Sequence, residues 1–172
     1  AEVAVIGFPE KGTPQGGILS PLLSNIVLNE LDWWITSQWV GMPTRHEYSG
    51  KIHENGTKDQ SKKYRELRKT NLKECYIVRY ADDFKIFCRK HSDAVKLFEA
   101  TRAWLKERLG LDISPEKSKI VNLKHAYSDF LGFRIKVHKG KRNQYVVISH
   151  IAPKALDGIK DTAKKKVKAI QH

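Results

Sequence analysis

Two adjacent aspartates, Asp82 and Asp83, are the residues of this sequence best suited to do chemistry. Neighbouring carboxylates repel each other, so placing both in a tight turn is unfavourable unless a cation neutralises them. Hard divalent cations prefer oxygen ligands, and Mg²⁺ commonly uses one or two protein carboxylates together with substrate phosphates. Two such ions can activate an attacking oxygen and stabilise a leaving oxygen in phosphoryl transfer. An isolated Asp-Asp pair is nevertheless more often ordinary turn chemistry, because aspartate readily bonds to its own backbone.

The sequence on either side of the pair predicts a β-hairpin with the acids at its tip. Two runs rich in β-branched and aromatic residues, 75–80 and 84–88, flank Ala81 and the two aspartates. Cys75, which begins the first run, and Cys88, which ends the second, are the only cysteines and could lie opposite each other. They are too few for a zinc site built from paired cysteines, so we predict reduced core thiols.

A second notable block precedes the hairpin and reads Gly-Thr-Pro-Gln-Gly-Gly-Ile-Leu-Ser-Pro-Leu-Leu-Ser-Asn over residues 12–25. Ser20 followed by Pro21 predicts the start of a helix, because serine caps free amides and proline fits the first helical position. Apolar residues then recur at helical spacing and predict a core helix that buries one face until near Gly41. These residues are Leu19, Leu22, Leu23, Ile26, Val27, Leu31, Trp34 and Ile35.

Helices and β runs alternate irregularly through the rest of the chain. Residues 42–74 predict an exposed basic insertion that either touches phosphates or is a solvated loop. A helix is predicted from Ser92 to Gly110, since glycine favours the left-handed helix end. Its predicted apolar face consists of Val95, Phe98, Leu105 and Leu109.

Short β runs and a final helix complete the pattern. The runs are predicted near 119–122, at 130–137 and at 144–149, and Pro153 opens an amphipathic helix with a lysine-rich face. Because strands and helices mix without strict alternation, the sequence favours an α+β architecture with antiparallel hairpins over a doubly wound sheet.

The net charge of +13 and pI of about 9.7 predict a polyanionic partner, since lysine and arginine release condensed counterions from phosphates. A merely soluble basic surface is the alternative. No leader peptide and no apolar stretch of about 20 residues is evident, so we expect no membrane association. The expected location is cytoplasmic, or organellar in a eukaryote.

The ordered blocks resemble the reverse transcriptases encoded by group II introns. The Pro-Gln-Gly block at 12–25 is followed in the family's order by Tyr80-Ala81-Asp82-Asp83, by 109–119 and by Phe130-Leu131-Gly132-Phe133. The resemblance covers nearly the whole chain. It implies a polymerase palm with an antiparallel sheet and packed helices over 1–149, with 42–74 as an insertion, and the start of a helical thumb or maturase region over 150–172.

The resemblance also implies roles for individual residues. Asp82 is the implied principal Mg²⁺ ligand and Asp83 a secondary one, and Mn²⁺ is a substitute. Residues implied to border the nucleotide and template are Thr13, Pro14, Gln15, Gly16, Tyr80 and Lys117, with Lys117 assisting the departing pyrophosphate. The implied primer grip is Phe130, Leu131, Gly132 and Phe133. The implied partners are an intron RNA template, a DNA or RNA primer and deoxynucleoside triphosphates, while dimerisation is not readable from the sequence.

Each of these residues also has an ordinary structural interpretation. The glycines and proline of the upstream block serve as turn punctuation, and Lys117 competes with Lys119 as one of many surface lysines. Phe130, Leu131 and Phe133 also have an interpretation as ordinary core residues. For Asp82 the ordered blocks around it favour the metal-binding role.

The family carries a further catalytic aspartate on a strand before the Pro-Gln-Gly block. Glu2 and Glu10 are the only acids before Gln15, and neither lies in such a context. We therefore expect this chain to be a piece of a longer protein, inactive alone, whose full form copies RNA into DNA and assists splicing.

Three other functions remain open. The chain could be a non-catalytic RNA-binding splicing cofactor, although the intact Asp pair argues against lost activity. It could belong to a retron, diversity-generating or defence-associated reverse transcriptase, or to an RNA polymerase, although viral RNA polymerases usually carry glycine where Ala81 stands. A plain basic scaffold would bind RNA without needing Asp82.

Overall fold

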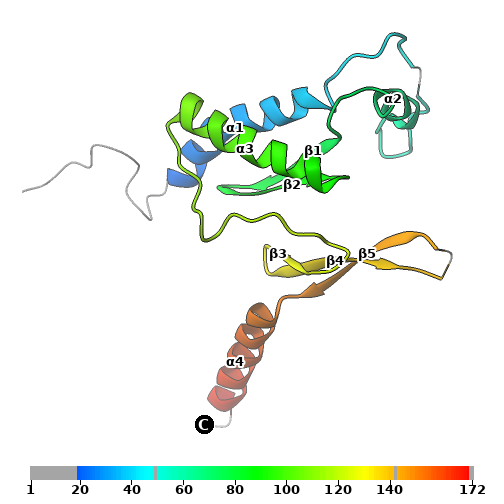
Figure 1. Ribbon diagram of the computed structural model, residues 1–172. Helices are drawn as coiled ribbons and strands as arrows, with labels where there is room; N and C mark the ends of the chain where they lie inside the picture. Colours follow the sequence, from blue (N-terminus) through cyan, green and yellow to red (C-terminus); the bar gives the residue numbers. More distant parts are fainter. Residues whose placement is uncertain (1–18, 49, 142, 171–172) are drawn as a thin grey trace, which may run out of the picture. The chain divides into compact units, whose positions relative to one another are not determined.

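The computed structural model describes residues 19–48, 50–141 and 143–170, which form two compact units divided between Ile113 and Ser114. The first unit contains α1 (Ser20–Gln38), α2 (Ser61–Leu67), β1 (Cys75–Tyr80), β2 (Asp83–Cys88) and α3 (His91–Leu109) (Figure 1). The second contains β3 (Ser128–Phe130), β4 (Phe133–Lys139), β5 (Tyr145–Ile151) and α4 (Pro153–Ile170). The α+β class predicted from the sequence is confirmed.

In the first unit two helices pack on one β-hairpin, α1 against β1 and α3 against β2 (Figure 1). The Trp34 and Trp104 rings stack at 5.1 Å between centroids and join the two helices. The buried core residues come from α1 and the residue that follows it, from α2, β1 and α3, and are Leu28, Leu31, Ile35, Trp39, Leu67, Cys75, Leu97 and Leu105. Residues of β2 pack against this core and are partly buried.

Helix α1 has two apolar faces, of which only one is in this core. Leu31 and Ile35 are fully buried, whereas Leu22 is 57% and Ile26 62% exposed. At 3.6 residues per turn, Leu22 and Ile26 project from the side of the helix opposite Leu31 and Ile35. The predicted continuous core stripe is therefore wrong for its first half. The helix also starts at Ser20 itself, so the predicted serine cap is replaced by Leu19 without a side-chain bond.

Helix α3 ends as predicted at Gly110, whose φ of 65° is left-handed. Its buried line differs from the predicted one, because it runs through Leu97, Thr101 and Leu105, while Val95 is 41% exposed. These three residues recur every four positions and therefore share one helix face.

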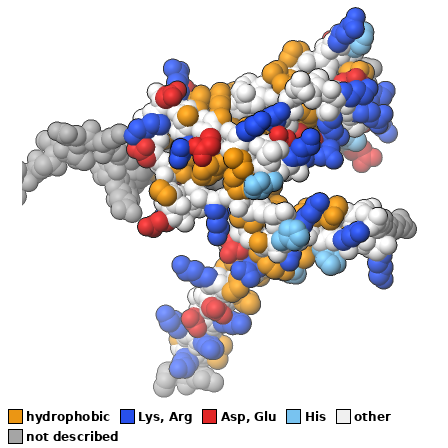
Figure 2. Space-filling view, viewed as in Figure 1, with side chains coloured by type: hydrophobic (Ala, Val, Ile, Leu, Met, Phe, Trp, Pro, Cys, Tyr) orange, Lys and Arg blue, Asp and Glu red, His pale blue; other side chains and the backbone are white. Residues whose placement is uncertain are grey.

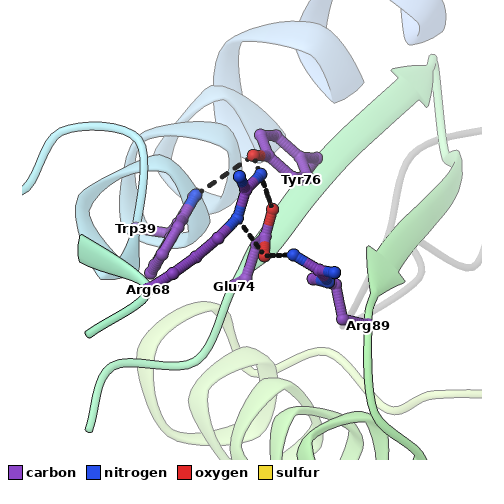
Figure 3. A network of polar contacts seen from close by, with 5 residues as sticks. All are labelled: Trp39, Arg68, Glu74, Tyr76 and Arg89. Carbon is purple, nitrogen blue, oxygen red and sulfur yellow. Dashed lines mark hydrogen bonds and ion pairs between the residues drawn. The ribbon is translucent and has the colours of Figure 1, made fainter. Parts of the chain in front are cut away.

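The predicted insertion is not wholly exposed, because its end enters the core. Leu67 is 2% exposed and Glu74 is 8% exposed. Arg68 donates to both carboxylate oxygens of Glu74, at 3.0 and 2.8 Å, and the Tyr76 hydroxyl donates to Oε1 at 3.1 Å (Figure 3). Arg89 adds an ion pair at 3.4 Å. The Arg68 hydrogen bond outweighs desolvation and lowers the pKa of Glu74.

The second unit is an antiparallel meander in the order β3-β4-β5, followed by α4. The predicted run 130–137 is split, because Leu131 and Gly132 form a turn with φ values of 51° and 78°. The strand predicted near 119–122 is absent from the described residues, where Asn122 instead accepts backbone bonds from His125 and Ala126 in a turn. Helix α4 begins at Pro153, as predicted, and has no buried residue.

Basic side chains gather in each of the two units. Figure 2 shows lysine and arginine gathered over the segment that carries α2 and along α4. Within the described ranges, no helix has the length and hydropathy needed to cross a membrane.

Candidate active-site hairpin

The hairpin of β1 and β2 turns through a loop of Ala81 and Asp82. Tyr80 pairs with Asp83, so Asp83 opens β2 rather than belonging to the loop as predicted. Ala81 has a φ of 52°, a value that residues other than glycine seldom adopt. Two-residue hairpin loops require such positive φ values because their twist must match that of the strands. The turn thus places Asp82 at the tip of the hairpin.

The two faces of the hairpin have different surroundings. Directly opposed pairs share a face, so Ile77 with Ile86 and Cys75 with Cys88 form the side that packs in the core. Tyr80 and Asp83 lie on the other side, where Tyr80 is 65% exposed. A one-residue slip would turn the core residues to solvent, so burial fixes the register and thereby the position of Asp82.

The two cysteines lie opposite each other and are free, as predicted. Burial is the main cause that raises the pKa of both thiols to about 11. Because the thiolate is the reactive form, these cysteines are structural residues at the end of the hairpin farthest from its loop.

Asp82 and Asp83 are both exposed, and in the described part of the chain neither side chain has a hydrogen-bond or ion-pair partner. The neighbouring arginine, Arg79, does not neutralise them, since it is engaged by Asp32. Two adjacent carboxylates without a counter-charge are suited to a hard divalent cation. No group of three or more candidate ligands gathers within the described ranges, so this pair alone does not complete a protein cage.

Arg79 and its partners were missed by the sequence reasoning. Its guanidinium donates to both oxygens of Asp32 at 2.6 to 3.0 Å, to Asn25 Oδ1 at 2.8 Å and to the Ala81 carbonyl at 2.8 Å. One available signal was that Arg79 falls on the same face of its strand as Cys75 and Ile77. A charged residue at such a position requires a buried partner.

Other predicted site residues lie elsewhere or outside the described part. Thr13, Pro14, Gln15, Gly16, Glu2 and Glu10 precede residue 19 and are outside it. Lys117 lies in a turn of the second unit, where the Ser118 amide bonds to Ser114, and both Lys117 and Lys119 are exposed. Their exposure does not distinguish between them.

Phe130 to Phe133 form a second hairpin tip, in the second unit. Phe130 pairs with Phe133, and both loop residues, Leu131 and Gly132, have positive φ, as in type I′ turns. Leu131 is 48% and Phe133 51% exposed, which differs from the core interpretation. The Gly132 carbonyl accepts a hydrogen bond from the Ala152 amide at 2.8 Å, which fastens this turn to the end of β5.

An acid-tipped hairpin packed on two helices defines a candidate polymerase palm, and comparison with known proteins identifies the family. Residues 6–135 match the family described as reverse transcriptase (RNA-dependent DNA polymerase). The chain belongs to this family, as the motifs predicted. Reverse transcriptases bind an RNA template, a primer and nucleotides, and generally use divalent metal ions.

Intron-encoded proteins are among the relatives. The chain is 30% identical over 159 residues to an intron 2 protein of COX1/OXI3 from Saccharomyces cerevisiae, with 80% of this chain and 18% of that protein covered. It is 32% identical over 158 residues to the group II intron-encoded protein LtrA of Lactococcus lactis subsp. cremoris, with 74% and 26% covered. Protein YkfC of Escherichia coli is 30% identical over 153 residues, with 87% and 39% covered. The chain thus spans well under half the length of these relatives.

Proposed function

We propose that the full-length protein carrying these residues is an RNA-directed DNA polymerase that uses Mg²⁺ at Asp82 and Asp83. The observation that carries this proposal is the exposed Asp pair at the tip of a register-locked hairpin, a pair that has no ion-pair partner among the residues that the structure describes. The membership of this chain in the reverse transcriptase family also supports RNA-directed DNA synthesis.

In this proposal Asp82 and Asp83 supply anionic oxygens to the metal. The bound ions supply activation of the primer 3′ hydroxyl and stabilisation of the leaving oxygen. The exposed Tyr80 ring offers an aromatic surface beside Asp83, of the kind on which a base or sugar packs. Lys117 provides a cation for the pyrophosphate and Phe130 to Phe133 support the primer end, while Thr13 to Gly16 border the new base pair.

We further propose that the RNA is an intron and that the protein also assists its splicing. The naming of LtrA as a group II intron-encoded protein and the origin of the yeast relative in an intron support this partner. The net charge of +13 supports binding to RNA, which both DNA synthesis on an RNA template and assistance of splicing require.

The test is primer extension on an RNA template by the full-length protein and its Asp82→Asn variant. The variant keeps the shape of the side chain but loses the charge, and we expect DNA synthesis to fall by at least about 1000-fold. Asp161→Asn, at an exposed position of α4, is the matched control and should leave synthesis unchanged. RNA binding with no DNA synthesis by the unmodified protein would instead favour the non-catalytic splicing cofactor.

A second measurement locates the metal without relying on activity. When Fe²⁺ replaces Mg²⁺ and hydrogen peroxide is added with ascorbate, the bound Fe²⁺ reduces the peroxide to hydroxide and a hydroxyl radical, which cleaves nearby backbone, and ascorbate reduces the resulting Fe³⁺ again. We expect cleavage at residues 80–84 in the unmodified protein and its loss in Asp82→Asn. Unchanged cleavage in the variant would contradict the metal-binding role of Asp82.

A further inference from the structure

The Arg79 side chain is only 10% exposed, although it lies beside the tip of an open hairpin. Its Nε and Nη2 atoms donate to the Asp32 carboxylate, and Nη1 donates both to Asn25 and to the Ala81 carbonyl, at 2.8 Å each. All three guanidinium nitrogens are therefore in use. The bidentate arrangement with Asp32 fixes the plane of the guanidinium as well as its charge.

The partners of Arg79 come from two elements that are far apart in the sequence. Asn25 and Asp32 lie on α1 and, seven positions apart, share one helix face. Ala81 belongs to the loop of the hairpin. Arg79 thus connects the loop to a helix that Leu31 and Ile35, on either side of Asp32 in the sequence, hold in the core.

The contacted carbonyl is directly connected to Asp82. The Ala81 carbonyl and the Asp82 amide belong to one planar peptide unit, so fixing the carbonyl fixes the direction in which the chain enters Asp82. The φ of 52° at Ala81 is unfavourable for a residue with a Cβ atom. A hydrogen bond from a charged donor offsets this unfavourable conformation.

We propose that Arg79 is a positioning residue that orients the peptide before Asp82, with Asp32 and Asn25 holding its guanidinium in place. The proposal rests on the metal-binding role of Asp82 proposed above. This positioning role differs from a purely structural role, in which Arg79 would only hold α1 against β1 and would require only the ion pair with Asp32. The hydrogen bond to the Ala81 carbonyl is the contact that distinguishes the two roles.

The test replaces Arg79 with lysine in the full-length protein. Lysine keeps the charge and can pair with Asp32, but a single ammonium cannot reproduce the planar fork that reaches Asp32, Asn25 and Ala81 together. We expect kcat to fall about tenfold, the loss that corresponds to one charged hydrogen bond. We also expect a higher Mg²⁺ concentration at half-maximal activity, and an unchanged KM for the primer-template duplex.

Hydrogen exchange supplies a readout that is independent of activity. The amides of residues 81–84 should exchange several-fold faster in Arg79→Lys, while those of 75–78 remain protected by the core. Arg108→Lys is the matched control, because Arg108 also pairs with α1, through Glu30 at 2.9 Å, but is 64% exposed and contacts no part of the hairpin loop in the described residues. That control should change neither exchange nor the Mg²⁺ requirement.

A double-mutant cycle with Ala81→Gly adds a second criterion. Glycine adopts positive φ without the Cβ penalty, so the turn needs less support from Arg79. We expect the loss caused by Arg79→Lys to be smaller in the Ala81→Gly background. If Arg79→Lys misfolds, Asn25→Ala removes a partner of the same guanidinium nitrogen and gives a milder version of the same effects.

The outcomes separate the two proposals. If Arg79→Lys lowers the melting temperature but leaves both the exchange at 81–84 and the Mg²⁺ requirement unchanged, the positioning role is overturned and Arg79 has only a structural role. Full activity of Asp82→Asn would overturn the proposed function of the hairpin. Faster exchange at 81–84 in Arg79→Lys would still establish that Arg79 holds the turn, whatever the result for Asp82.

Discussion

Glu74 and Asp82 carry the same functional group in opposite surroundings. Glu74 is buried and accepts hydrogen bonds from Arg68 and Tyr76, whereas Asp82 is exposed and has no side-chain partner in the described part of the chain. Burial with partners makes a carboxylate part of the scaffold. Exposure beside a second carboxylate leaves it available for a ligand.

Glu74→Gln should destabilise the first unit by about 1 to 2 kcal/mol, because the network loses a charged acceptor while Arg68 and Arg89 can still reach water. Urea unfolding followed by tryptophan fluorescence measures this, since Trp33, Trp34, Trp39 and Trp104 all lie in that unit. Glu66→Gln, which removes an exposed ion pair with Lys69, is the control and should cost less than about 0.5 kcal/mol.

The effect of pH on the stability difference between the unmodified protein and Glu74→Gln has a defined direction. Because the pKa of Glu74 is lowered from 4.5, its stabilisation is complete above that value and is lost as the pH falls through the lowered pKa. The stability difference between the unmodified protein and Glu74→Gln should therefore be constant near pH 7 and shrink below about pH 4.5. A difference that grows on acidification would contradict the assignment.

At the scale of the secondary-structure elements, replacing glycine with alanine should have opposite effects on stability at Gly110 and at Gly158, because the two glycines have different backbone conformations. Gly110 ends α3 with a φ of 65°, and a Cβ atom there would meet nothing within 4 Å. Gly110→Ala should therefore destabilise the first unit by about 1 to 2 kcal/mol through backbone conformation alone. Gly158 lies inside α4, and a Cβ atom there would also meet nothing within 4 Å. Gly158→Ala should therefore stabilise this helix by up to about 1 kcal/mol and raise the helix content of the protein. Urea unfolding and circular dichroism test the pair.

The elements also show where sequence reasoning succeeded and failed. The hairpin of Asp82 and the left-handed end at Gly110 were predicted because local patterns determine them. The strand near 119–122 was wrong because the side chain of Asn122 stabilises a turn, through the Lys124 amide at 3.1 Å. The run from Phe130 was split because Leu131, a residue that normally favours extended or helical backbone, occupies a left-handed turn.

Contacts that need tertiary structure could not be predicted. The meeting of Arg79 with Asp32 depends on how α1 docks on the hairpin, and no local pattern specifies that geometry. The family itself was recognisable because its blocks retain their order along the chain, a property that does not require the fold to be known.

At the scale of the whole molecule, the charge of +13 predicts salt-sensitive RNA binding. Lys164, Lys165 and Lys168 are exposed on α4, and replacing all three with glutamine should reduce the slope of log affinity against log salt by about 2 for single-stranded RNA. The same three positions changed to arginine keep the charge and should keep the slope. Filter binding across a salt series measures it, and an unchanged slope in the glutamine variant would show that these lysines are only solvated.

The contacts of Arg79 also constrain how this sequence can evolve. A lineage that lost Arg79 would leave Asp32, whose side chain is 29% exposed, without its counter-charge and would release the turn before Asp82. A lineage that lost Asp32 would leave a nearly buried guanidinium unpaired. We therefore expect Arg79 and Asp32 to be replaced together more often than singly, and part of the selective constraint on the aspartates to extend to α1.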